Sequence, residues 1–91
     1  MARQQQQDLL ILGQAVRELR QERHRSIRNL ATLCGAPAGR LAALEAGRLD
    51  PDLELLAALA QGLGVTRSEI FLRAEQLATG GPDSPPGQQA R

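Results

Sequence analysis

The sequence predicts an all-α fold, a compact bundle of five helices. Leucine and alanine, which favour helices, dominate the apolar residues, and the 91-residue chain contains a single aromatic side chain, Phe71. Apolar residues recur at three- and four-residue steps, and residues that start or end helices stand between those stretches. A chain of this length forms one domain, and its small core needs tight packing or pairing with a second chain.

The first helix is predicted over 8–23. Its apolar face follows the helical period and consists of Leu9, Leu12, Val16 and Leu19. Leu10 and Ile11 fall off that face, so they either cap the core or face a partner chain.

The second and third helices are predicted over 26–34 and 37–46. Ser26 is a natural N-terminal cap, and Gly35 ends the second helix. Pro37 suits the first turn of the third helix. Two short helices joined by a tight turn that contains glycine are typical of a helix-turn-helix unit.

The fourth and fifth helices are predicted over 52–63 and 66–77. The fourth follows a turn at Asp50-Pro51-Asp52, and its apolar residues recur at helical spacing. Thr66 and Glu69 form a capping box at the start of the fifth helix.

These elements divide the chain into three parts. Residues 1–7, with a run of four glutamines, are predicted to be a flexible N-terminus. Residues 8–79 form the helical domain. Residues 80–91 are rich in glycine, proline and glutamine and are predicted to be a disordered tail.

The sequence shows no pattern for catalysis or metal binding. Cys34 is the only cysteine, so an internal disulfide is excluded, and it is expected to be a small core residue rather than a nucleophile. The lone histidine, His24, is expected at the surface. A phosphate-binding loop, a catalytic carboxylate pair and metal-ligand spacing are all absent from the sequence. We therefore expect no enzyme activity, no metal, no cofactor and no small-molecule ligand.

Hydropathy argues against a membrane protein. The longest apolar run, Leu9–Leu12, is far shorter than the roughly 20 residues of a membrane span, and the N-terminus lacks the pattern of a signal peptide. Together with the lone cysteine, this favours a cytoplasmic location.

The charge distribution is uneven although the net charge is only +1. Residues 1–48 carry eight arginines against four acidic residues, and residues 49–91 carry three against six. Every basic residue is arginine. Arginine is well suited to phosphate and guanine, although a GC-rich codon usage produces the same bias.

A set of residues between Leu12 and Val65 has the identities and the spacing that a known family shares. They are Leu12-Gly13, Val16-Arg17, Leu19-Arg20, Ser26, Leu30-Ala31, Gly35, Leu41, Leu44-Glu45, Gly47-Arg48, Pro51, Leu56, Ala60 and Leu63-Gly64-Val65. With this pattern, residues 12–65 resemble the phage-repressor-like (Cro/Xre) helix-turn-helix family. The resemblance implies a lambda-repressor-like DNA-binding domain. It also implies an ion pair between Arg20 and Glu45 that ties the first helix to the end of the third, the alternative being two ordinary exposed charges.

The resemblance further implies that the third helix reads DNA, and here the sequence departs from the family pattern. The base-reading positions correspond to Ala38, Gly39 and Ala43, whose side chains form no hydrogen bonds. Ile27 stands where the family often has a glutamine that binds phosphate. Arg40 remains as a side chain that can fork onto a guanine. Alternatively, Arg40 only solvates the outer face of the helix.

Phosphate contacts are expected around the third helix, from Arg25, Ser26, Arg28, Asn29 and Arg48. Such contacts position a protein on DNA without selecting a sequence. Singly, each of these residues also fits a solvated surface position.

The predicted function is therefore a sequence-specific DNA-binding transcriptional regulator, a homodimer acting on an inverted repeat in double-stranded DNA. The alternative is a protein-interaction module that has kept the helix-turn-helix scaffold and lost base readout. The short side chains of the third helix favour the alternative, and the surplus of arginine in the N-terminal half favours the regulator.

The dimer is predicted to form through the fifth helix. This helix carries more apolar residues than one face buries against its own domain, and the predicted interface consists of Ile70, Phe71, Leu72 and Leu77. The N-terminal segment with Leu9, Leu10 and Ile11 is the alternative interface.

Overall fold

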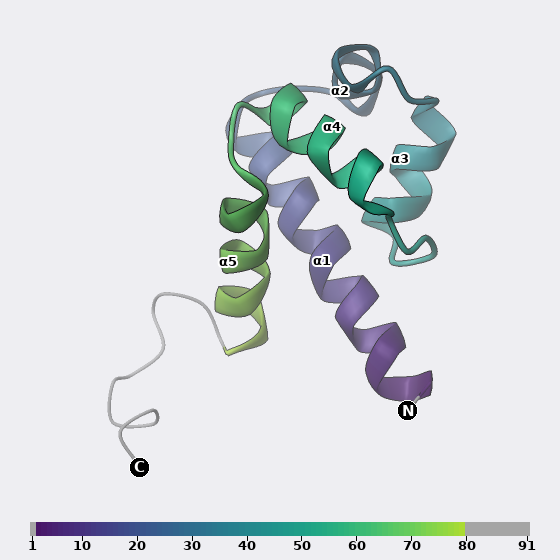
Figure 1. The fold of residues 1–91 in the computed structure, drawn as a ribbon, viewed down its shortest axis with the longest axis vertical. Helices are drawn as coiled ribbons and strands as arrows, with labels where there is room; N and C mark the ends of the chain where they lie inside the picture. The colour runs from purple at the N-terminus through teal and green to yellow at the C-terminus, as the bar shows by residue number, and fades with distance from the viewer. Residues whose placement is uncertain (1, 80–91) are drawn as a thin grey trace.

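The computed structural model describes residues 2–79, which form five helices and no strand. Their bounds are α1 Ala2–Glu22, α2 Ile27–Cys34, α3 Ala38–Glu45, α4 Leu53–Leu63 and α5 Arg67–Ala78. The long α1 packs beside α5, and α2 and α3 lie at the other side of α4 (Figure 1). The predicted all-α, five-helix fold is confirmed.

The predicted start of the first helix is wrong by six residues, because α1 begins at Ala2 rather than at Asp8. Apolar periodicity begins only near Asp8, but glutamine and alanine favour helices and nothing in the preceding segment interrupts one. The prediction that residues 1–7 are flexible is a statement about motion, and it stays a prediction. The predicted tail, 80–91, lies outside the described residues.

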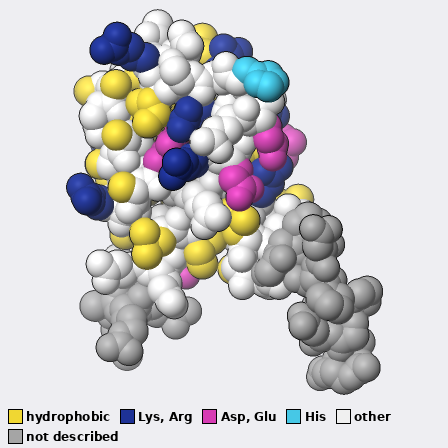
Figure 2. Space-filling model, turned by 180° about the vertical axis from the view of Figure 1, so that it is seen from behind, with side chains coloured by type: hydrophobic (Ala, Val, Ile, Leu, Met, Phe, Trp, Pro, Cys, Tyr) yellow, Lys and Arg dark blue, Asp and Glu magenta, His cyan; other side chains and the backbone are white. Residues whose placement is uncertain are grey.

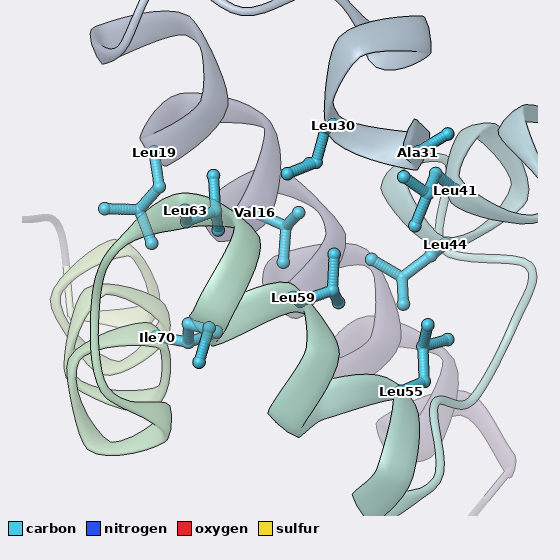
Figure 3. Close-up of a cluster of buried hydrophobic side chains, with 11 residues drawn as sticks. Val16, Leu19, Leu30, Ala31, Leu41, Leu44, Leu55, Leu59, Leu63 and Ile70 are labelled. Carbon is cyan, nitrogen blue, oxygen red and sulfur yellow. The ribbon is translucent and has the colours of Figure 1, made fainter. Parts of the chain in front are cut away.

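The core collects apolar side chains from all five helices (Figure 3). Val16 of α1, Leu30 of α2, Leu59 of α4 and Ile70 of α5 have no exposed surface. Fully burying an aliphatic side chain of this size stabilises a fold by about 1.5–3 kcal/mol. One central cluster, to which α3 adds Leu41 and Leu44, therefore holds the five helices in fixed positions.

The helix ends use the backbone geometry that the sequence predicted. Ser26, Asp52 and Thr66 each accept a hydrogen bond from the backbone N–H three residues later, and Thr66 and Glu69 form the reciprocal capping box. Left-handed residues follow four helices: His24 after α1, and Gly35, Gly47 and Gly64 after α2, α3 and α4. His24 is the non-glycine residue among them, and its φ of 56° is unusual for a residue with a side chain.

An ionic clamp joins α5 to α1. Arg73 donates hydrogen bonds to both carboxylate oxygens of Glu22, at 2.6 and 3.1 Å, and to Glu18 at 3.2 Å. The bonds from Arg73 hold the pKa of Glu22 below its ordinary value of 4.5. Because this pKa is lower in the folded state than in the unfolded state, the clamp stabilises the fold above about pH 4.5 and weakens as pH falls through the folded-state pKa.

No single helix within residues 2–79 is both long and apolar enough to cross a membrane. The pair α4 and α5 reaches that length and composition only when taken together, across a bend of 92°.

Candidate nucleic-acid interface

The helix-turn-helix unit consists of α2, the turn 35–37 and α3. Gly35 takes a left-handed conformation with φ of 71°, and Ala36 donates its backbone N–H back to Ala31 at 3.1 Å. Leu30 and Ala31 of α2 and Leu41 and Leu44 of α3 are buried in the shared core. This packing fixes the angle at which α3 leaves the turn and presents its outer face.

The end of α3 rests against α1 at Gly13. A Cβ atom built on Gly13 would lie 2.4 Å from the carbonyl oxygen of Leu44 and 2.7 Å from that of Glu45. Only glycine permits so close an approach of a helix to a neighbouring backbone. Gly13 thereby places the C-terminal end of α3 directly on α1.

Arg20 and Glu45 lie together as the sequence predicted. Arg20 Nε donates to Glu45 Oε2 at 2.7 Å, and Nη2 donates to Oε1 at 3.0 Å. Their side chains are 12% and 6% exposed. The hydrogen bonds to Glu45 raise the pKa of Arg20 above its ordinary value, with burial opposing the shift. Nη1 of Arg20 also donates to the carbonyl oxygen of Arg25 at 2.8 Å, so one side chain connects α1, α3 and the loop before α2.

At the start of α2, two predicted phosphate contacts are engaged with each other. The Ser26 hydroxyl accepts the backbone N–H of Asn29 and donates to its side-chain oxygen, both at 3.0 Å. Ser26 therefore shapes the helix start, and Asn29 is an exposed residue. Arg25 and Arg28 are exposed on either side of this cap.

The outer face of α3 carries very short side chains. Gly39, Arg40 and Ala42 are exposed, whereas Ala38 and Ala43 are partly buried and Ala38 packs against the core. Ala38 is thus in part a structural residue rather than a free contact. A Cβ added to Gly39 would meet no atom within 4 Å. Arg40 is the long side chain of this face.

Several arginines around α3 have no partner in the part of the chain that the structure describes. Within residues 2–79, the guanidinium groups of Arg28, Arg40 and Arg48 form neither a hydrogen bond nor an ion pair, and all three residues are exposed. Figure 2 shows several dark-blue arginine side chains over the upper part of this face, among apolar and acidic side chains. Unpaired, exposed guanidinium groups of this kind are available to phosphate oxygens.

The two candidates for chemistry occupy the positions that the sequence predicted. His24 is exposed in the loop after α1. Cys34 is partly buried against the core, and burial raises the pKa of its thiol. Within the described part of the chain, no group of three or more histidine, cysteine or acidic residues is arranged to hold a metal ion.

The predicted dimer surface needs a correction. Ile70 has no exposed surface and belongs to the core, so it cannot contact a second chain. Phe71 and Leu72 are 47% and 53% exposed, and Leu77 is partly buried. The sequence correctly indicated that α5 carries more apolar residues than its own domain buries. It did not show which of these residues face inward.

Arg17 of α1 was not among the site residues predicted from the sequence. In the structure it is exposed and borders a hollow between α1 and the helix-turn-helix unit. The sequence shows only a solvent-facing arginine on an amphipathic helix. It gives no signal that Arg17 lies near α3, because the α3 residues at the hollow stand about 25 positions later in the chain.

The chain is similar to known helix-turn-helix proteins in sequence and structure. The family described as Helix-turn-helix domain matches residues 11–70. No curated protein sequence matches the chain. The restriction-modification controller protein C.AhdI from Aeromonas hydrophila is 33% identical with a TM-score of 0.70, over 70% of this chain and 97% of the controller.

The clp gene regulator ClgR from Corynebacterium glutamicum is also similar. It is 31% identical with a TM-score of 0.72, over 75% of this chain and 72% of the regulator. These comparisons confirm the helix-turn-helix resemblance and support the prediction of a regulator rather than an enzyme. The chain belongs to the helix-turn-helix domain family.

Proposed function

We propose that the chain is a sequence-specific DNA-binding transcriptional regulator that acts as a homodimer on an inverted repeat. The observation that carries the proposal is the set of exposed arginines around the helix-turn-helix unit, Arg28, Arg40 and Arg48, which lack partners within residues 2–79. Two similar proteins of solved structure, a restriction-modification controller and a clp gene regulator, add support.

In the proposed complex, α3 enters the major groove and α2 crosses the phosphate backbone. The short Gly39 and Ala42 let α3 approach the base edges closely, and Arg40 supplies hydrogen bonds to a guanine. Arg28 and Arg48 contact phosphates on either side, with Arg25 and Asn29 at the start of α2 as further contacts. Alanine methyl groups on α3 pack against thymine methyl groups.

Binding is tested by fluorescence anisotropy on duplexes selected from a random pool, with a salt series. Arg40→Ala is expected to reduce the preference for the selected sequence by about 1–3 kcal/mol. Arg28→Ala and Arg48→Ala are each expected to weaken binding to all duplexes alike. Each is also expected to lower the slope of log K against log salt concentration by about 0.9 per bound protomer. An unchanged sequence preference in Arg40→Ala would show that Arg40 does not read a base.

A second candidate function is a protein-interaction module that no longer reads DNA. The observation that favours it is the α3 face itself, where Gly39 and Ala42 are exposed and offer a smooth surface for close helix packing. Failure of the wild-type chain to bind any duplex even at low salt would favour this candidate over the regulator.

The proposed dimer joins two copies through α5. Phe71 and Leu72 are half exposed, and Phe71 borders an apolar hollow of about 460 Å³ between α5 and the first half of α1, lined also by Leu9, Ile11 and Leu12. Pairing there would cover apolar surface that one chain leaves in water. Binding to an inverted repeat requires the two copies of α3 to enter successive major grooves about 34 Å apart.

Phe71→Glu is expected to convert the dimer into a folded monomer. The side chain is half exposed and absent from the buried core, so a charge at its position opposes pairing without disrupting folding. Sedimentation equilibrium at micromolar concentration measures the association, and thermal unfolding followed by circular dichroism checks the fold. A wild-type chain that is monomeric under these conditions would contradict the dimer.

A further inference from the structure

We propose that Arg17 of α1 is a further DNA contact, which binds a backbone phosphate at the point where α2 meets the duplex. This inference rests on the proposed DNA-binding function and adds a residue from outside the helix-turn-helix unit. The feature that carries it is a hollow of about 220 Å³ between α1 and that unit. Its walls are Arg17, Arg20, Ile27, Ala42, Glu45 and Ala46.

The position of the hollow selects phosphate as the ligand. Ile27 is the first residue of α2, the helix that crosses the DNA backbone in a helix-turn-helix complex, and Ala42 and Ala46 lie on the flank of α3 that faces α1. A cation at the edge of the recognition helix, beside the start of α2, therefore lies next to the sugar-phosphate strand rather than over the base edges. Ile27 has no hydrogen-bond donor in its side chain, so Arg17 is the free side-chain donor among the residues that line this hollow.

The charges around the hollow leave Arg17 uncompensated. Both oxygens of Glu45 accept hydrogen bonds from Arg20, at 2.7 and 3.0 Å. Glu18, the next residue on α1, accepts from Arg73. Within residues 2–79, the guanidinium of Arg17 itself forms no hydrogen bond or ion pair, and the residue is exposed. The nearby acids are thus engaged by other arginines, and the positive charge of Arg17 is available to a phosphate.

The shape of the α3 flank allows the contact. Ala42 and Ala46 end at Cβ, so neither of their side chains stands between Arg17 and an approaching strand. A long side chain at either position would occupy the hollow that the arginine spans. The small residues of α3 therefore matter on this flank because they leave Arg17 room to reach the DNA.

The test compares Arg17→Ala and Arg17→Lys with Arg67→Ala, which removes the same charge from the exposed start of α5. Affinity for the selected duplex and for an unrelated duplex is measured by fluorescence anisotropy over a salt series. Arg17→Ala is expected to lower the affinity for both duplexes by about fivefold near physiological salt. It is also expected to lower the slope of log K against log salt concentration by about 0.9 per bound protomer. Arg17→Lys is expected to keep the wild-type slope, and Arg67→Ala to change it less than Arg17→Ala does.

Thermal unfolding of each variant is measured alongside, and no change is expected because the side chain of Arg17 is exposed and unpaired within residues 2–79. If Arg17→Lys is as well folded as the wild type and loses the same slope as Arg17→Ala, the phosphate contact is wrong. If the wild type binds DNA and Arg17→Ala keeps the wild-type slope, only the Arg17 assignment fails. If the wild type binds no duplex at low salt, the proposed function and this contact both fail.

Discussion

Replacing Gly13 by alanine is expected to destabilise the domain by about 3 kcal/mol, the upper part of the usual range for overpacking a tight contact. The added methyl group would lie within 3 Å of three backbone atoms of Leu44 and Glu45. Backbone atoms cannot rotate away as a flexible side chain does, so the end of α3 has to move off α1. Chemical denaturation followed by circular dichroism measures the loss of unfolding free energy.

Gly39→Ala is the matched control for this change. The same methyl group on Gly39 would meet nothing within 4 Å, and the residue lies in the first turn of α3. Alanine is a better helix former than glycine by up to about 1 kcal/mol, so this variant is expected to be as stable as the wild type or more stable. Equal effects of the two substitutions would show that the contact between Gly13 and α3 is not the cause.

Replacing Arg20 by alanine is expected to lower the free energy of unfolding by about 3 kcal/mol, the lower end of the range for breaking a buried ion pair. The loss strands the carboxylate of Glu45, whose side chain is only 6% exposed, and removes the hydrogen bond to the carbonyl oxygen of Arg25. For a domain of this size the melting temperature is expected to fall by more than about 10 °C. Differential scanning calorimetry measures this shift.

Arg73→Ala is the comparison for the Arg20 variant. Arg73 also forms two hydrogen bonds to one carboxylate, but Glu22 is half exposed, and ion pairs at such surfaces contribute about 0–1 kcal/mol. A loss in Arg20→Ala no larger than the loss in Arg73→Ala would contradict a special role for the pair between Arg20 and Glu45.

Local signals account for the part of the fold that sequence predicted well. Ser26, Asp52 and Thr66 act within three residues of their own positions, and left-handed glycines end α2 and α4 through bonds to the preceding turn. Such interactions join residues that are close in the chain and do not depend on tertiary packing, so they can be predicted from the sequence. The start of α1 was placed too late because glutamine-rich helix leaves no apolar signature.

Tertiary geometry accounts for what sequence did not predict. Ile70 and Phe71 are adjacent and both apolar, yet one has no exposed surface and the other is half exposed, because only packing against α1 and α4 fixes the rotation of α5. Arg17 likewise gains its place beside Ala42 only when α3 docks on Gly13. The pair between Arg20 and Glu45 was predictable because the family pattern carries both positions.

The face of α3 that points outward contributes little to holding the domain together. Leu41 and Leu44 anchor the helix from its inner side, while Gly39 and Ala42 contact mainly solvent. At these positions, the residues that would contact DNA are separate from the residues that secure the scaffold. A library of side chains at position 39 would sample new operator preferences on an unchanged framework, which makes this domain a starting point for recoding by design or by natural drift.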